Sequence, residues 1–142
     1  LKRIIPETII SLINNQSLQI RSSGKLRRDY LYVDDAVNAY YLIMKKLEQN
    51  NINRLLIYNV SSINNLSVIQ LVSIISNLMN KKNVKPIITN KSKKEDNFQK
   101  LNDSKIKKEL GWKQKISITK GLKNTITWYQ KNYSLIQNKK FK

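Results

Sequence analysis

The chain has 142 residues, 40% of them hydrophobic, and its 27 Lys and Arg against 9 Asp and Glu give a formal net charge of +18. It contains no Cys, which excludes disulfides and thiolate metal sites, and no His, the commonest general base and zinc ligand. No apolar run approaches the roughly 20 residues that a membrane-spanning helix needs, and we expect no signal peptide. The composition therefore predicts a cytoplasmic globular chain that is poor in catalytic side chains.

The positive charge has two interpretations. Lys and Arg bind nucleic acids by releasing counterions from phosphates, so a small nucleic-acid-binding module is one hypothesis. The other is a composition rich in Lys, Asn and Ile, with the lysines spread over solvated faces. We favour the second, because the lysines do not gather on one helix and no basic and aromatic platform for single strands is present. A basic surface would also attract a small anionic ligand.

The first predicted elements are a helix and a short strand. The helix opens near Pro6, which suits a first helical turn, and it ends at Asn14-Asn15. Its apolar face is formed by Ile5, Ile9, Leu12 and Ile13. A short strand around Leu18 and Ile20 then leads into a turn in which Gly24 is free to take a positive φ. With residues 26–33 it forms either a small hairpin or two strands that pair elsewhere.

A half-buried strand followed by an amphipathic helix is predicted next. Tyr30 and Tyr32 alternate with Leu31 and Val33, as in a strand. Asp34 is expected to be the N-cap of the helix rather than a catalytic acid, and Asp35 suits the positive end of the helix dipole. The core-facing stripe of this helix is expected to contain Ala36, Ala39, Tyr40, Ile43 and Leu47.

The middle of the chain predicts another strand, a helix and an edge strand. Residues 55–60 form a nearly continuous apolar run, as expected for a buried and perhaps parallel strand. Ser67 is expected to cap a helix that runs to about Met79. Residues 86–89 predict a short edge strand because they open on a Pro, and residues 91–100 predict an exposed loop.

The C-terminal part predicts two helices. A short one starts at residues 103–105 and ends at Leu110, with Gly111 just beyond it. The last helix has a face formed by Leu122, Ile126, Tyr129 and Tyr133. Trp112 and Trp128 are expected to serve packing. With no internal repeat and no linker, we predict one portion over residues 1–133 and a basic, frayed tail over residues 134–142.

Four runs of this sequence, in order, resemble the extended short-chain dehydrogenase/reductases, which are NAD(P)-dependent nucleotide-sugar epimerases and 4,6-dehydratases. The runs are RIIPETIISLI (3–13), LQIRSSGKLRRDYLYVDDA (18–36), YNVSSINNLSVIQLV (58–72) and DSKIKKELGWKQKISITKGLKNTITWY (103–129). The resemblance implies an α/β fold: the C-terminal part of a Rossmann-type fold, with the last sheet strand and helices and a small substrate-binding lobe. The spacing of the first two runs favours the CDP-glucose 4,6-dehydratase-like group.

The family's cofactor and catalytic signatures are absent. Binding of a dinucleotide needs a Gly-rich loop, but Gly24, Gly111 and Gly121 are far apart. The catalytic Tyr-x-x-x-Lys pair would lie upstream, since Tyr41 and Lys45 match it by spacing only. The resemblance therefore implies a longer parent enzyme that uses NAD or NADP to oxidise the sugar at C4. This chain alone would bind no cofactor and catalyse no reaction. The expected partners are a nucleotide-diphosphate sugar, the missing N-terminal Rossmann portion and, for the parent, a second copy; we expect neither membrane nor nucleic acid as a partner.

The resemblance also implies a set of substrate-binding residues. Arg28 would bind the diphosphate, because a guanidinium fork matches phosphate oxygens. Tyr30, on the same face, would either reach the ribose or diphosphate or serve packing. Residues 19–21 would line the base unless they form a plain surface strand, and the helix around Arg3 and Pro6 would help to close the pocket. The base-lining residues would be Gln19, Ile20 and Arg21, and Lys93 or Lys94 would substitute for the family's second phosphate-binding Arg. Glu95, followed by Gln99 and Leu101, either resembles a run seen in some dehydratases or is a solvated loop carboxylate. Asp29 is expected to be structural.

A rival within the same fold is a non-catalytic remnant that acts as a binding subunit. Neither this rival nor the nucleic-acid-binding module explains why four separated runs occur in the order of the family.

Overall fold

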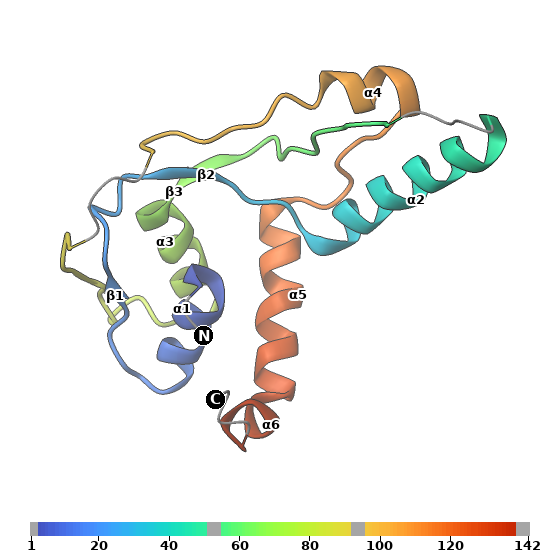
Figure 1. The fold of residues 1–142 in the computed structure, drawn as a ribbon. Coiled ribbons are helices and arrows are strands. Elements are labelled where there is room, and N and C mark those ends of the chain that lie inside the picture. Colours follow the sequence, from blue (N-terminus) through green and yellow to red (C-terminus); the bar gives the residue numbers. More distant parts are fainter. Residues whose placement is uncertain (1–2, 51–54, 92–95, 139–142) are drawn as a thin grey trace.

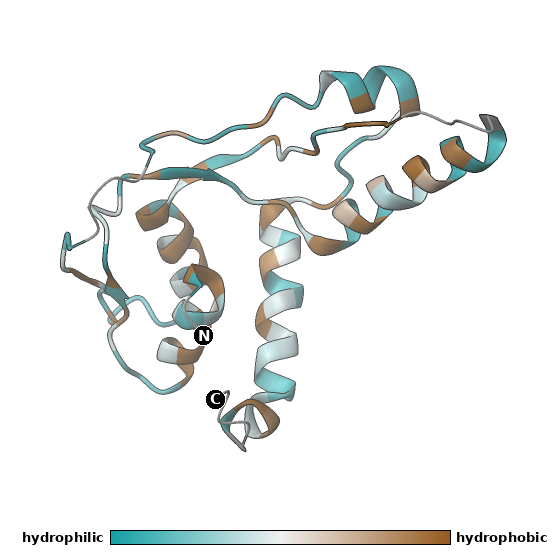
Figure 2. Cartoon of the chain, viewed as in Figure 1, coloured by the Kyte–Doolittle hydropathy of each residue, from teal (hydrophilic) through white to brown (hydrophobic). Residues whose placement is uncertain are grey.

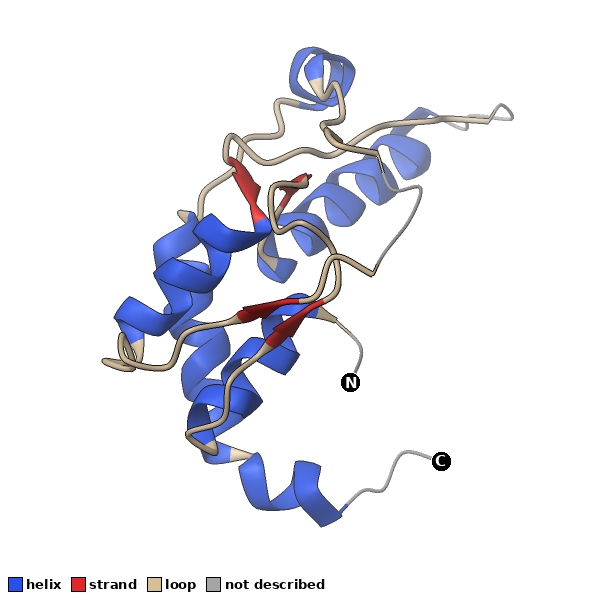
Figure 3. Ribbon diagram, turned by 90° about the vertical axis from the view of Figure 1, so that its left-hand side faces the viewer, coloured by secondary structure: helices blue, strands red, loops and turns tan. Residues whose placement is uncertain are grey.

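The computed structural model describes residues 3–50, 55–91 and 96–138, which form helices around two short strand pairs (Figures 1 and 3). The helices are α1 (Ile4–Ile13), α2 (Val33–Asn50), α3 (Val68–Leu78), α4 (Ser104–Leu110), α5 (Ile118–Lys131) and α6 (Tyr133–Asn138). The strands are β1 (Gln19–Ile20), β2 (Arg27–Asp29), β3 (Asn65–Ser67) and β4 (Ile87–Ile88).

Neighbouring strands in the sequence pair with distant ones. β1 pairs with β4 in parallel, with Gln19 opposite Ile87, and β2 pairs with β3 antiparallel, with Arg28 opposite Leu66. A bridge from Arg27 to Phe98 adds a third extended segment beside β2. Of the two sequence-based alternatives for β1 and β2, the structure therefore shows strands that pair elsewhere rather than a hairpin.

The main core lies between α1, α3 and α5. Its buried side chains are Ile9, Leu12, Leu71, Ile75, Leu122 and Ile126. α3 begins as predicted at Ser67, whose hydroxyl accepts from the Gln70 backbone N–H while the Gln70 side chain accepts from the Ser67 N–H. The apolar spacing of all three helices was visible in the sequence, and the three helices are confirmed. Tyr133, predicted to share the face of the last helix, lies beyond the end of α5 and begins α6.

A second cluster joins α2 to α4, away from the main core (Figure 1). It is built on Ala39, Ile106 and Trp112, all at most 1% exposed. The indole N–H of Trp112 donates to the backbone carbonyl of Asp35 at 3.0 Å. α4 ends as predicted at Gly111, which has a φ of 65°. Trp112 is thus a core residue as expected, whereas Trp128 is exposed and contacts Tyr129 edge to face.

The start of α2 differs from the prediction. The ladder of β2 ends at Asp29, so residues 30–32 belong to no strand, and α2 already begins at Val33. The Tyr32 carbonyl accepts from the N–H groups of Asp35 and Ala36. Asp34 therefore lies in the first turn and is not the N-cap. The alternation of residues 30–33 was misleading because residues 30–32 form the short connection between β2 and α2.

Two apolar stretches predicted to be buried are partly exposed. Tyr40 and Leu47, assigned to the core-facing stripe of α2, are 74% and 42% exposed, because α2 turns Ala39 rather than Tyr40 toward Trp112. Residues 55–60, predicted to form a buried strand, belong to no strand of the described chain. Leu55 and Ile57 are 84% and 64% exposed.

The end of the chain is helical as far as the structure describes it. α6 covers Tyr133–Asn138, at the start of the segment expected to be a frayed tail, and residues 139–142 lie outside the described residues. None of the helices in the described ranges is long and apolar enough to cross a membrane.

Candidate functional site

A cavity of about 560 Å³ opens between the start of α1, β1 and β2. Its floor and walls combine apolar residues with several charged ones. They are Arg3, Ile4, Ile5, Pro6, Glu7, Gln19, Ile20, Arg21, Ser22, Arg28, Tyr30, Val68 and Gln99. Pockets of this size and mixed lining suit small organic ligands.

The cavity brings together most of the residues that the sequence singled out. Arg28, Tyr30 and residues 19–21 all line it, although β1 and β2 belong to different strand pairs. Arg3 and Pro6, expected to close the same pocket, line it as well. Their roles in binding remain predictions. Lys93, Lys94 and Glu95 lie outside the described residues, so the structure does not place them.

Arg28 is held at the rim by backbone carbonyls. Its Nη1 donates to the carbonyl oxygens of Arg27 at 2.9 Å and of Asp96 at 2.7 Å. The Asp96 carbonyl belongs to the segment that runs beside β2, so this segment fixes where the guanidinium lies. A guanidinium oriented in this way presents a planar set of donors in a defined direction, which is what recognition of phosphate or carboxylate oxygens requires.

Tyr30 brings an aromatic ring and a hydroxyl to the same cavity. Burial raises the pKa of Tyr30 above its ordinary value of 10.0, and the nearby positive charge of Arg28 opposes this shift with a smaller effect. The hydroxyl is buried and has no hydrogen-bond partner among the described residues. A buried polar atom of this kind is costly unless a water or a ligand satisfies it.

The charge of the lining is positive. Three arginines and one glutamate, Arg3, Arg21, Arg28 and Glu7, give a formal sum of +2. The cavity is therefore suited to an anionic ligand with a partly apolar body.

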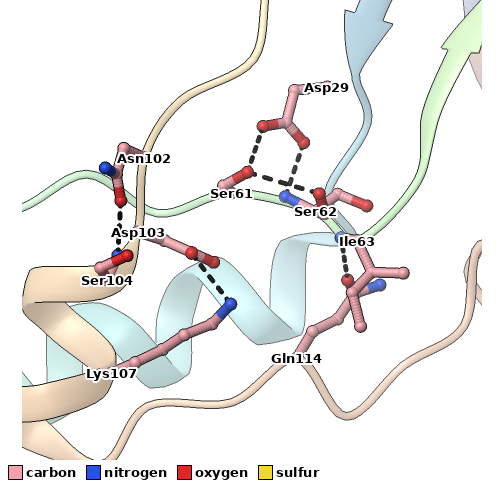
Figure 4. Close-up of polar contacts among 9 residues, drawn as sticks. All are labelled: Asp29, Ser61, Ser62, Ile63, Asn102, Asp103, Ser104, Lys107 and Gln114. Carbon is pink, nitrogen blue, oxygen red and sulfur yellow. Dashed lines mark hydrogen bonds and ion pairs between the residues drawn. The ribbon is translucent and has the colours of Figure 1, made fainter.

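Asp29 supports the site from the other face of β2, as predicted (Figure 4). Its carboxylate accepts from the Ser61 hydroxyl and the Ser62 backbone N–H, both at 2.6 Å. The next backbone N–H, that of Ile63, donates to the Gln114 side chain at 2.8 Å. These bonds fasten residues 61–63 to β2 on one side and to the segment between α4 and α5 on the other. Asp29 thus has a structural role.

Sequence reasoning assigned no role at this site to several of the lining residues, among them Glu7, Ser22, Val68 and Gln99. Gln99 joins the site because its backbone N–H donates to the Arg27 carbonyl at 3.2 Å. That pairing spans more than 70 residues of sequence, and no local pattern indicates it. Glu7 could have been suspected, since it lies one residue after Pro6.

In the described ranges, no three His, Cys, Asp or Glu side chains gather closely enough to hold a metal ion.

Residues 1–125 match the family model described as GDP-mannose 4,6 dehydratase. The chain belongs to this family. The match confirms the resemblance to the extended short-chain dehydrogenases that act on nucleotide sugars, and it covers all of the cavity's lining residues.

Known relatives agree with this assignment. The chain is 30% identical to dTDP-D-glucose 4,6-dehydratase of Mus musculus over 139 residues, which is 93% of this chain and 37% of the relative. It is 27% identical to dTDP-glucose 4,6-dehydratase of Escherichia coli, covering 98% of this chain and 39% of that enzyme. The chain thus spans about two-fifths of the length of these relatives. They are dTDP-glucose enzymes, so the preference for a CDP-glucose group gains no support from them.

Solved structures show the same α/β arrangement inside longer chains. The dTDP-glucose 4,6-dehydratase from Bacillus anthracis, in complex with NAD, superposes with a TM-score of 0.79 at 25% identity, over 94% of this chain and 40% of that one. A UDP-glucose 4-epimerase from Thermotoga maritima, with UDP-glucose, gives a TM-score of 0.81 at 24% identity, over 92% and 40%. The second likeness concerns the fold alone.

Proposed function

We propose that this chain is the substrate-binding portion of an NAD(P)-dependent nucleotide-sugar 4,6-dehydratase or epimerase, and that its cavity binds the nucleoside diphosphate of the sugar. The observation that carries the proposal is the convergence of Arg28, Tyr30 and residues 19–21 on one positively charged cavity. The family resemblance of the sequence implies that role for the same residues. A diphosphate carries about the charge needed to balance a lining of +2.

Each part of the lining has a distinct role in this proposal. Arg28 donates to the diphosphate, and the Tyr30 hydroxyl, unsatisfied within the described chain, donates to a phosphate or ribose oxygen. The backbone and side chains of residues 19–21 contact the edge of the base. Pro6, at the start of α1, supplies apolar surface that closes the cavity from the other side.

The cofactor does not fit the residues of this chain. A dinucleotide cradle needs glycines that let the backbone approach the pyrophosphate. A Cβ at Gly24 would lie 2.6 Å from Ile69, a Cβ at Gly121 would lie 2.8 Å from Tyr32, and Gly111 ends α4. These three are all the glycines of the chain. We therefore propose that NAD(P) and the catalytic groups belong to the part of the relatives that this chain does not span.

The nucleotide that we propose first is a dTDP-sugar, because the relatives of Mus musculus and Escherichia coli carry that name. Titration of the chain with dTDP, UDP, GDP and CDP by isothermal calorimetry would rank the four bases. The proposal predicts measurable binding of a nucleoside diphosphate and much weaker binding of the nucleoside that lacks phosphates.

The adjacent arginines of β2 provide a matched test. Arg28→Ala should weaken the binding of dTDP by more than tenfold, because it removes a charge-assisted donor from the cavity. Arg27→Ala removes the same charge one residue away, but Arg27 bonds to Asn65 and does not line the cavity, so the affinity should change by less than about threefold. Equal losses of affinity in both variants would mean that Arg28 acts only through its positive charge.

In the full-length parent enzyme, Arg28→Ala should raise KM for the sugar nucleotide by more than tenfold, and an unchanged KM would contradict the assignment.

A further inference from the structure

A cavity of about 230 Å³ lies between α3 and the loop that joins α3 to β4. Its lining combines apolar residues with hydroxyl groups and lysines. The lining residues are Ile69, Val72, Ser73, Ser76, Asn77, Lys82, Val84, Lys85 and Pro86. None of them lines the cavity that contains Arg28, so the two cavities are separate. We call the new one the α3 cavity and the other the Arg28 cavity.

The loop that forms one wall of the α3 cavity is held at both ends. The backbone turns at Asn80, which has a φ of 56°, a conformation that Asn adopts more readily than most residues. The Lys81 N–H then donates to the Ser76 carbonyl at 2.9 Å, and the Val84 N–H donates to the Lys81 carbonyl at 3.1 Å. At its other end the loop continues into β4, which pairs with β1. The wall is therefore a defined part of the fold.

Three polar side chains of α3 in this lining form no hydrogen bond within the described residues. They belong to Ser73, Ser76 and Asn77. A hydroxyl inside a helix often donates to the carbonyl four residues earlier, as those of Thr8 in α1 and Thr125 in α5 do. Ser76 is only 8% exposed and lacks this bond among the described residues, so its hydroxyl remains available to a molecule in the cavity.

The charge of the α3 cavity comes from two lysines of the loop. Lys82 and Lys85 give the lining a formal sum of +2. Neither forms an ion pair within the described ranges, and no acidic residue occurs between Glu48 and Glu95 in the sequence. The loop is hydrophilic at residues 80–83, in contrast with the largely hydrophobic α3 (Figure 2). The lining thus combines uncompensated positive charge with apolar surface, which suits an anion that has an apolar body.

Size and charge together indicate the class of ligand. The volume of the α3 cavity lies below the roughly 300–1,000 Å³ of pockets for drug-sized molecules, so the ligand is smaller. A phosphate monoester carries a charge of about −1.5 to −2 at neutral pH and three strong acceptor oxygens. It therefore balances the two lysines and accepts from the serine hydroxyls as well, whereas a carboxylate offers one charge and two oxygens.

We propose that the α3 cavity is a second ligand site, which binds the phosphate monoester of a small, partly apolar molecule. Lys82, Lys85 and the Ser76 hydroxyl donate to the phosphate oxygens. The apolar residues of α3 and the loop contact the body of the ligand; they are Ile69, Val72, Val84 and Pro86. The proposal is independent of the function proposed for the Arg28 cavity, because the two cavities share no lining residue.

Phenyl phosphate is a suitable probe, since it joins one phosphate to a small apolar ring. The ¹⁵N-labelled chain would be titrated with it at pH 7.5 and followed by two-dimensional ¹H–¹⁵N NMR. The largest shift changes are expected at the backbone N–H groups of residues 72–77 and 82–85, with smaller changes at residues 19–22 of the Arg28 cavity. Inorganic phosphate lacks the ring and phenol lacks the charge, so each should bind at least about fivefold more weakly.

Substitutions locate the site independently of the shifts. Lys82→Ala and Lys85→Ala should each weaken the binding of phenyl phosphate by about fivefold or more, and Ser76→Ala should weaken it by about threefold. Lys123→Ala removes the same charge from an exposed position of α5 that lines neither cavity, and the affinity should change by less than about twofold. Because Lys82 and Lys85 are exposed, circular dichroism of their variants should match that of the unmodified chain.

Three other outcomes overturn the proposal. The first is an absence of shift changes up to about 10 mM phenyl phosphate, well above the range of specific ligands. The second is binding centred on residues 3–7 and 19–22 that Arg28→Ala weakens, which would assign the probe to the Arg28 cavity. The third is an equal loss of affinity in the variants of Lys82, Lys85 and Lys123, which would reduce the effect to net charge. Failure of dTDP to bind would contradict the proposed function alone and leave the α3 cavity unaffected.

Discussion

Arg27 and Arg28 show how two adjacent residues of one strand meet different surroundings. Side chains alternate between the two faces of a strand, so the neighbours cannot share a partner. The Arg27 side chain reaches Asn65 of β3, with Nε 3.1 Å from the amide oxygen, and it also donates to the Asn65 carbonyl. Arg28 turns to the cavity instead. Arg27 thus adds side-chain bonds to the backbone pairing of β2 with β3, whereas Arg28 lines the cavity.

The buried hydroxyl of Tyr30 leads to a prediction about stability and pH. Because this hydroxyl has no partner in the described chain, Tyr30→Phe should change the free energy of unfolding by less than about 1 kcal/mol at pH 7, or raise it. Burial raises the pKa of Tyr30 in the folded state, so the unfolded chain loses its proton first as the pH passes 10. The original protein should therefore lose stability relative to Tyr30→Phe above that pH. Urea unfolding of both proteins at neutral pH and near pH 10.5 would measure the loss of unfolding free energy between the two pH values. An equal loss in both proteins would contradict the prediction.

The same variant tests the ligand role of the hydroxyl. If Tyr30 donates to a phosphate or ribose oxygen, Tyr30→Phe should weaken dTDP binding by roughly fivefold, the equivalent of one ordinary hydrogen bond. Calorimetric titration of both proteins would show it. An unchanged affinity would assign Tyr30 to packing, the alternative that its sequence left open.

At the scale of elements, a single carboxylate joins the start of α2 to the segment before α5. Asp35 is 2% exposed and accepts from the backbone N–H groups of Lys115 at 2.9 Å and Ile116 at 3.0 Å. Asp35→Ala should lower the free energy of unfolding by about 1–3 kcal/mol, since it leaves these donors without their acceptor. Asp34→Ala removes an exposed acid from the same turn and should cost less than about 1 kcal/mol. Urea denaturation followed by circular dichroism would compare the pair, and similar losses would mean that Asp35 acts only on the helix dipole.

Asp35 also illustrates how far sequence reasoning reached. The sequence placed both acids at the start of a helix, because local spacing and helix electrostatics are visible in neighbouring residues. It could not show that one of them bonds to backbone 80 residues away. The sequence grouped residues that line one cavity for the opposite reason. Arg28, Tyr30 and residues 19–21 lie within twelve residues of each other, and a family resemblance identified them together.

The two errors about burial have a common physical origin. Tyr40 and segment 55–60 are apolar, and their patterns predict contact with a hydrophobic partner. A pattern reports that a surface needs to be covered, but not which polypeptide covers it. Both stretches belong to segments that pack on the Trp112 cluster, α2 through Ala39 and residues 55–60 through Tyr58 and Val60.

At the scale of the whole molecule, the formal net charge of +18 should act on how fast an anion reaches the cavity. Such attraction is long-ranged and is screened by salt, with a Debye length of about 10 Å at about 0.1 M and about 3 Å at about 1 M. The contact of Arg28 with a phosphate is short-ranged and is screened much less. Between these two salt concentrations, the association rate constant for dTDP should fall by about tenfold, while the dissociation rate constant changes by less than about threefold.

Stopped-flow fluorescence of the chain with dTDP would separate the two rates. Thymidine provides the control, because it shares the base and sugar but carries no charge, and its association should hardly respond to salt. A rise in the dissociation rate constant without a change in the association rate constant would mean that the positive charge acts only through direct contacts at the cavity. The lysines outside the cavity would then have no part in binding, whereas the expected result gives the compositional bias of this chain a role in capturing its ligand.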